Sequence, residues 1–186
     1  MMFIRAYISM FSCLLLIAPS RFAAGEKLSA LKGDSKISYE LSHPLHKVEA
    51  TTKDFTCEIE LSESKEISSV KFSADVTTFD SGNSNRDSHA MEVIDAISYP
   101  DVAFQSTGIS ADGDKLNVTG NLTFHGVTKR VSFNASRKLV DGKLIVEGAA
   151  ALSLTEFKID RPALLAIRVD DTLKISFVMA FSVPRN

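Results

Sequence analysis

The stretch LNVTGNLTF, residues 116–124, places an apolar or small residue at every second position and asparagine or threonine between them. Successive side chains of a β-strand point to opposite faces, so this period predicts a strand with one apolar and one polar face. Similar alternation recurs in residues 70–76, 144–154 and 173–183. Several such strands, with almost no helical periodicity elsewhere, predict a closed barrel or two stacked sheets.

One segment breaks this pattern and has helical spacing instead. Ala90, Ile94 and Ile97 recur every three to four residues, which predicts one short helix around residues 86–96, ended before Pro100. The dipeptides His125-Gly126 and Asp141-Gly142 predict tight hairpin turns, and residues 26–34 read as a polar lead-in. The predicted fold class is all-β: a single extended antiparallel up-and-down β-barrel of about eight strands. From the alternation alone, a two-sheet sandwich also remains open.

The N-terminus has the layout of a secretory signal peptide. A short basic start ending at Arg5 precedes an apolar run over residues 6–18, and small residues follow at 23–25. The apolar run is short for a membrane-spanning helix, which argues against the alternative of a retained anchor. We therefore expect residues 1–25 to be cleaved, leaving residues 26–186 as one exported domain.

The composition of the remaining chain excludes several classes of function. The predicted signal peptide contains Arg5 and Arg21, so the domain has a net charge of about −4 and no basic patch that would attract nucleic acid. It keeps one cysteine, Cys57, in phase with the apolar Phe55 and Ile59. A single thiol forms no internal disulfide, and this setting predicts a small buried side chain rather than a reactive one.

No motif for catalysis stands out. The chain has no GxSxG elbow, P-loop or GxGxxG motif, and its four histidines lack the spacing of a zinc site. We therefore expect no enzyme activity, no metal and no catalytic cofactor. Glu156 and Asp160 are four positions apart, which is the one candidate acid–base pair for a less favoured alternative, a lipid-modifying enzyme.

Three motifs in order carry a resemblance to a known family. They are FDSG followed by RDSH in residues 79–89, YPDVAFQS in residues 99–106, and VTGNLTFHGVTK in residues 118–129. Together they resemble the YceI-like family of exported bacterial proteins, over about residues 35–183. His43 stands where this family often has a histidine.

The resemblance implies a lipocalin-like barrel in the periplasm that carries a long apolar molecule. Polyisoprenoids, isoprenoid quinones and fatty-acid amides are the ligands that it suggests, and a bound lipid or quinone would take the place of a cofactor. Residues 154–165 depart from the usual family sequence in a region that helps shape the barrel mouth. The ligand and its head group are therefore not specified by the resemblance.

The sequence offers wall residues and polar residues for such a site. Eight apolar side chains are candidates for the wall, although they would equally fill a solid core. Arg86 and His89, together with His43, are the polar candidates for a head group, and a guanidinium suits phosphate. The alternative for Arg86 is a network with Asp87 or Asp75 that pins the helix to the barrel. The wall candidates are Phe72, Phe104, Leu122, Phe124, Phe133, Leu152, Phe177 and Met179.

The predicted function is sequestration of one long apolar lipid inside the barrel. The alternative is a non-catalytic accessory or interaction module for membrane b-type cytochromes or quinone enzymes, as the family's associations suggest. A long-chain lipid is the expected partner, and nucleic acid is not. Transient contact with a membrane or membrane protein, and a homodimer, remain open.

Overall fold

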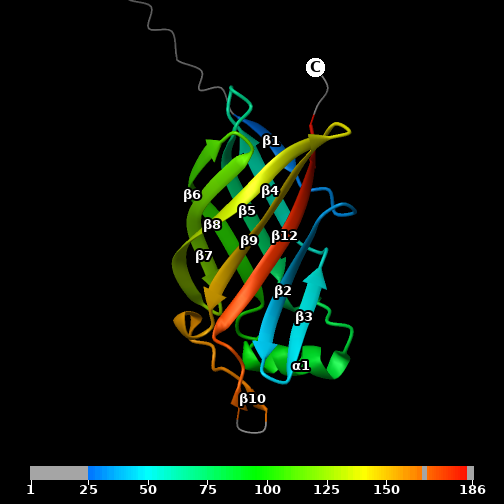
Figure 1. The fold of residues 1–186 in the computed structure, drawn as a ribbon, viewed down its shortest axis with the longest axis vertical. Coiled ribbons are helices and arrows are strands. Elements are labelled where there is room, and N and C mark those ends of the chain that lie inside the picture. The colour runs from blue at the N-terminus through cyan, green and yellow to red at the C-terminus, as the bar shows by residue number, and fades with distance from the viewer. Residues whose placement is uncertain (1–24, 165–166, 184–186) are drawn as a thin grey trace, which may run out of the picture.

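Ten antiparallel strands form one curled sheet, with a two-stranded ribbon at one end (Figure 1). The computed structural model describes residues 25–164 and 167–183, so residues 1–24 of the predicted signal peptide lie outside the described residues. The order across the sheet is β1-β4-β5-β6-β7-β8-β9-β12-β2-β3. The strands are β1 (Glu26–Ser29), β2 (Lys36–His43), β3 (His46–Thr52), β4 (Thr56–Leu61), β5 (Ile67–Asp75), β6 (Asp101–Asp112), β7 (Lys115–Phe124), β8 (Val127–Val140), β9 (Lys143–Ser153), β10 (Ala163–Leu164), β11 (Ile167–Arg168) and β12 (Thr172–Ser182).

The all-β, antiparallel barrel with one short helix is confirmed. The described sheet has ten strands rather than about eight, partly because the polar lead-in forms β1, whose one buried residue is Leu28. A strand of four residues is too short to show alternation. Consecutive strands from β4 to β9 are neighbours in the sheet, and the predicted hairpin turns both adopt positive φ, at His125-Gly126 and at Asp141-Gly142.

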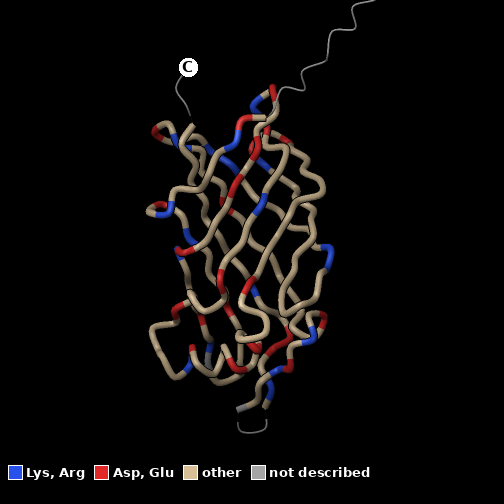
Figure 2. Tube along the Cα trace, turned by 180° about the vertical axis from the view of Figure 1, so that it is seen from behind, with Lys and Arg blue, Asp and Glu red and all other residues tan. Residues whose placement is uncertain are grey.

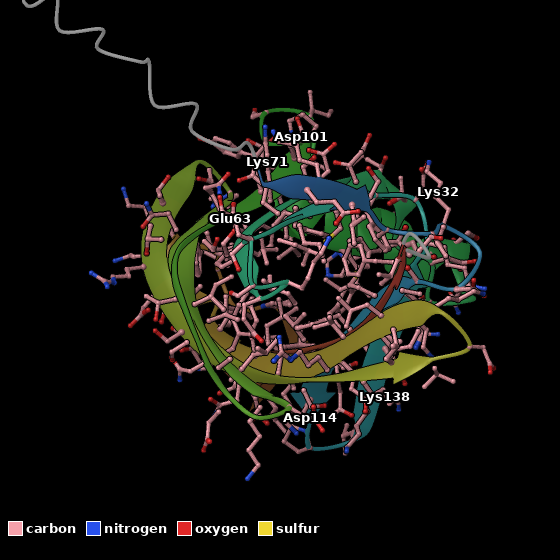
Figure 3. All side chains as sticks on the ribbon, turned by 90° about the horizontal axis from the view of Figure 1, so that it is seen from above. Lys32, Glu63, Lys71, Asp101, Asp114 and Lys138 are labelled. Carbon is pink, nitrogen blue, oxygen red and sulfur yellow. The ribbon has the colours of Figure 1, made fainter. Side chains whose placement is uncertain are left out.

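The sheet closes through isolated bridges at its two edges. At one edge, Ala30 bridges Phe181, and Leu31 donates its N–H to the carbonyl of Ala180. At the other edge, Thr51 and Asp80 exchange two backbone hydrogen bonds of 3.0 Å. Seen from above, the strands surround a common centre, and labelled charged residues such as Lys138 and Asp114 lie on the outside (Figure 3).

The predicted alternation of residues 116–124 is confirmed in β7. Leu116, Val118 and Leu122 are buried on its inner face, whereas the asparagines on the other face are exposed. Gly120 lies on the inner face as well, and a Cβ atom there would clash with the Phe104 ring and with the Gln105 carbonyl oxygen. Only glycine therefore lets the Phe104 ring lie flat against the strand.

The helix α1 (Ser84–Val93) lies across one end of the barrel (Figure 1). Asn83 begins it by accepting the N–H of Arg86 on its side-chain oxygen, at 3.1 Å. The predicted extension to residue 96 is wrong, because Asp95 adopts a φ of 45° and turns follow it. Ile97, assigned to the helix face by its spacing, is 97% exposed. Among the described residues, no helix is both long enough and apolar enough to cross a membrane.

Acidic and basic residues are interspersed along the strands of the sheet (Figure 2). Exposed ion pairs join neighbouring strands, such as Lys27 with Glu60 at 3.0 Å and Lys174 with Glu40 at 3.1 Å. Exposed pairs of this kind contribute at most about 1 kcal/mol each. The apolar interior therefore carries most of the stability of the fold.

Candidate ligand-binding cavity

The strands enclose a cavity of about 440 Å³. Its wall is almost wholly apolar and takes side chains from nine strands of the main sheet, from α1 and from the segment around β10. This volume lies in the range of known small-molecule sites. At about 30 Å³ for each water-sized group, it corresponds to a chain of roughly 15 carbon atoms. The cavity therefore has room for one apolar molecule of about this size.

All eight predicted wall residues line this cavity. They border this cavity, and Phe72, Phe104, Leu122 and Met179 also belong to the buried apolar cluster. Their contact with a ligand stays a prediction. Two of them, Phe104 and Phe177, lie against glycines, since a Cβ at Gly120 or Gly148 would overlap their rings.

Aromatic rings stiffen the wall. The centroid of the Phe133 ring is 5.5 Å from that of Phe104 and 5.6 Å from that of Phe177, in tilted and edge-on geometries. These geometries favour ring–ring attraction.

The end of the barrel near α1 has a floor that the sequence did not predict. The short 3-10 helix η2 (Thr155–Phe157) follows β9, and Leu154, Phe157 and Ile159 around it are buried. Asp171 accepts the Ser153 hydroxyl and, at 3.0 Å, the Thr155 N–H, and these two bonds, Ser153 first, lower the pKa of its carboxyl. The segment that departs from the family pattern is therefore part of the cavity's closure.

Sequence reasoning predicted Arg86 and His89 of α1 at the site, but it did not assign the apolar residues of this helix to the cavity wall. The alternating pattern in β2 would have identified the residues of that strand that line the cavity. The missed lining residues include Ile37, Tyr39 and Leu41 on β2, Ala90, Met91, Val93 and Ile94 in or directly after α1, and Leu154, Ile159, Pro162, Ala163 and Val169 in the floor.

His43 lines the cavity, but its ring nitrogens contact the backbone. Its Nδ1 accepts the N–H of Leu45 at 3.2 Å, so the proton lies on Nε2, which donates to the Ile167 carbonyl at 3.1 Å. His43 thus ties the β2–β3 hairpin to β11. Its predicted role at a head group stays untested, and these bonds give it a structural one.

Arg86 and His89 are on the cavity wall at the α1 end, together with Tyr39. The predicted network that would pin Arg86 to a carboxylate is wrong. Asp75 instead accepts the N–H and hydroxyl of Thr77, and Asp87 accepts the N–H of Ser81. The Nε of Arg86 is fully buried without a hydrogen-bond partner.

Cys57 is buried on the cavity wall, as its phase predicts. Burial, with a smaller effect of Glu58, raises its pKa from 9.0 to about 12. At pH 8 the reactive thiolate is then about a thousandfold rarer than in an ordinary cysteine. We expect iodoacetamide to label Cys57 of the folded protein, lacking residues 1–25, far more slowly than the same protein unfolded in guanidinium. Equal labelling rates would contradict this burial.

An ion pair closes the opposite end of the barrel. Arg137 follows the lining residue Ala135 on the inner face of β8, and its two terminal nitrogens donate to the Glu66 carboxylate and one of them to the Gly113 carbonyl. The first part of β5, residues 67–70, forms no ladder with β6. The backbone pairing between these two strands begins at Lys71. The Glu66–Arg137 pair therefore joins the β4–β5 hairpin to β8 where β5 and β6 are not paired.

This pair predicts a pH dependence of stability. The hydrogen bond from Arg137 lowers the pKa of Glu66 below its ordinary 4.5, so the stabilisation is present above pH 4.5 and is lost as the pH falls through the folded-state pKa. We expect Glu66→Gln to lower the urea midpoint at pH 7, and the difference to shrink towards pH 3. Glu63→Gln, an exposed change in the same hairpin, is the control. A difference that persists unchanged at pH 3 would contradict the prediction.

Comparison with known proteins places this architecture. The YceI-like domain matches residues 30–181. Protein YceI of Escherichia coli O157:H7 is 30% identical over 129 residues, which are 67% of this chain and 68% of that protein. For other curated relatives, such as one from Pseudomonas putida, the match spans 66% of their length.

Two solved structures share the fold. BcnA from Burkholderia cenocepacia has a TM-score of 0.73 at 23% identity, covering 81% of this chain and 98% of that one. A polyisoprenoid binding domain from Saccharophagus degradans has a TM-score of 0.66 at 12% identity, covering 86% of this chain and 99% of that one. The domain match, the curated relative and the barrel geometry agree, and this chain belongs to the YceI-like domain family.

Proposed function

We propose that this protein binds one long apolar chain, a polyisoprenoid or a fatty acyl chain, inside its barrel and shields it from water. The observation that carries the proposal is the 440 Å³ cavity with an apolar wall. Each buried methylene contributes about 0.8 kcal/mol, so a chain that fills the cavity offsets the cost of ordering it. The similar fold of the Saccharophagus polyisoprenoid binding domain supports this class of ligand.

The proposed role is carriage or storage rather than chemistry. Glu156 and Asp160, the acid–base pair considered from sequence, are both exposed, and neither lines the cavity. The described residues contain no cluster of histidine, cysteine and carboxylate groups that could hold a metal ion. A wall of this kind mainly offers a ligand tail burial, and His43, one of its two histidines, contacts backbone groups through both ring nitrogens.

The proposal includes export to the periplasm. Export is supported by residues 1–25, which have the layout of a secretory signal peptide. In that compartment a carrier would move or store a membrane-derived lipid that is poorly soluble in water. Cell fractionation tests this part, with the processed protein expected in the periplasmic fraction.

Extraction of the purified protein with organic solvent, followed by mass spectrometry, tests the binding proposal. We expect one apolar molecule per protein, and we expect delipidated protein to take up hexadecanol or geranylgeraniol. A protein that yields no lipid and takes up neither alcohol would contradict carriage and would favour the interaction module.

A further inference from the structure

We infer that the ligand is an acid, whose carboxylate or phosphate head group pairs with Arg86 at the α1 end of the cavity. This inference rests on the proposed function, since it names the head group of a ligand whose tail fills the barrel. It commits to an anion, and it leaves the carboxylate and the phosphate as two sources for the test to separate.

The first observation is that Arg86 has a charge without a partner. Its guanidinium makes no hydrogen bond or ion pair with any described residue, and its Nε is buried. The Nε is shielded from water and has no partner, and an anion that binds the guanidinium would supply one. The two carboxylates considered from sequence do not bind it, because Asp87 accepts the Ser81 N–H and Asp75 accepts the Thr77 N–H.

The second observation is that the cavity contains no carboxylate of its own. Its charged or titratable lining residues are Tyr39, His43, Cys57, Arg86 and His89. Arg86 supplies a fixed positive charge, while the Cys57 thiol is held neutral by burial. The cavity lining therefore supplies a positive charge and no negative one, so the negative partner would have to come from the ligand.

The third observation is the position of Arg86 in its helix. It lies in the first turn of α1, three residues after the cap Asn83. The N-terminus of a helix carries partial positive charge, so a cation there is unfavourable for the helix. Helix stability therefore does not explain this arginine, whereas the same partial charge would favour a bound anion.

Tyr39 completes the head-group position. Burial raises the pKa of its hydroxyl, with Asp87 adding to the rise and Arg86 opposing it, so the three groups lie close enough to interact. The hydroxyl and the guanidinium both donate hydrogen bonds, which an acid head group accepts. His89, whose side chain is 66% exposed beside Glu92, lies at the outer rim.

This placement fixes the direction of the ligand. The head group lies at the α1 end, and the tail runs towards the end that the Glu66–Arg137 pair closes. Tyr39, Arg86 and His89 line the cavity at the α1 end, so a polar head group meets polar side chains there.

Displacement of an uncharged fluorescent apolar probe, N-phenyl-1-naphthylamine, at pH 8 tests the inference. The pairs compared are palmitic acid with hexadecanol, and geranylgeranyl phosphate with geranylgeraniol, which differ only in the head group. We expect the wild-type protein to bind at least one acid about 10- to 100-fold more tightly than its alcohol, as a charge-assisted hydrogen bond predicts. The pair that shows the larger ratio identifies carboxylate or phosphate as the source.

Substitutions separate the charge of Arg86 from general effects. We expect Arg86→Gln to remove the preference for the acid over its alcohol, and Arg86→Lys to keep part of that preference. Arg130→Gln, on the exposed face of β8, is the matched control and should keep the full preference.

The outcomes divide cleanly. Equal binding of acid and alcohol by the wild-type protein, or a preference that survives Arg86→Gln, overturns the inference and leaves the proposed function standing. Failure of both acids and both alcohols to displace the probe overturns the proposed function and the inference together.

Discussion

Replacing Ala150 with tryptophan is expected to weaken binding of a 16-carbon chain by roughly a thousandfold while the barrel stays folded. Ala150 lines the cavity from β9, so an indole ring there enters the space proposed for the ligand tail. If the ring displaces about five methylene groups at about 0.8 kcal/mol each, the lost binding energy is about 4 kcal/mol. Probe displacement measures the affinity, and circular dichroism checks the fold.

The neighbouring residue offers a matched control for this change. Ala149 is exposed on the outer face of the same strand, so Ala149→Trp adds the same ring outside the barrel. We expect it to leave affinity within about twofold, since no cavity volume is lost. Unchanged affinity of Ala150→Trp would contradict the assignment of the cavity as the binding site.

Phe157→Ala is expected to lower the free energy of unfolding by about 3–5 kcal/mol. The Phe157 side chain is 1% exposed, its ring centroid is 5.8 Å from that of Phe124, and its carbonyl lies 2.9 Å from His125 Nδ1. Truncating the ring leaves a cavity in the packed floor of the barrel, beside the buried Leu154 and Ile159. Urea unfolding monitored by circular dichroism measures the change.

A phenylalanine on the cavity wall is expected to lose less free energy of unfolding than Phe157 when it is replaced by alanine. Phe133 is only half-buried and borders the open interior, so it contacts protein atoms on fewer sides than Phe157. We expect Phe133→Ala to cost clearly less than Phe157→Ala. Equal costs for the two variants would contradict the distinction between a packed floor and an open lumen.

Local periodicity explains why so much of the wall was predictable. In β7, residues 116–124 show which side chains share a face, and the same reasoning selected Phe104, Phe133 and Phe177. Neighbouring strands in a curled sheet turn that face inward together. All of the candidate wall residues therefore line a single cavity.

The interior volume was not predictable from the same pattern. A solid core and a hollow one present the same apolar faces, and the difference depends on how far apart opposite walls lie. Closure is also a long-range property, since it depends on single bridges such as Ala30–Phe181 and Thr51–Asp80. No local spacing in the sequence encodes these contacts.

At the polar end of the site, the sequence predicted which residues line the cavity but not which hydrogen bonds and ion pairs they make. Sequence placed Arg86 and His89 near a head group, but it also allowed Arg86 to pair with Asp75 or Asp87. Those carboxylates are taken by Thr77 and Ser81, which are close in sequence and reach them through turn geometry. His43 is bound instead by a residue far away in the sequence, since its hydrogen bond to Ile167 spans more than a hundred residues, and no local pattern predicts such a contact.

The measurement that tests the hollow lumen most directly is a calorimetric titration of the delipidated protein with straight-chain alcohols of increasing length. We expect the dissociation constant to fall about three- to fourfold with each added methylene, as burial of about 0.8 kcal/mol per group requires. The fall should stop near the roughly 15 carbons that a cavity of 440 Å³ accommodates. An affinity that does not change with chain length would contradict a ligand-binding lumen.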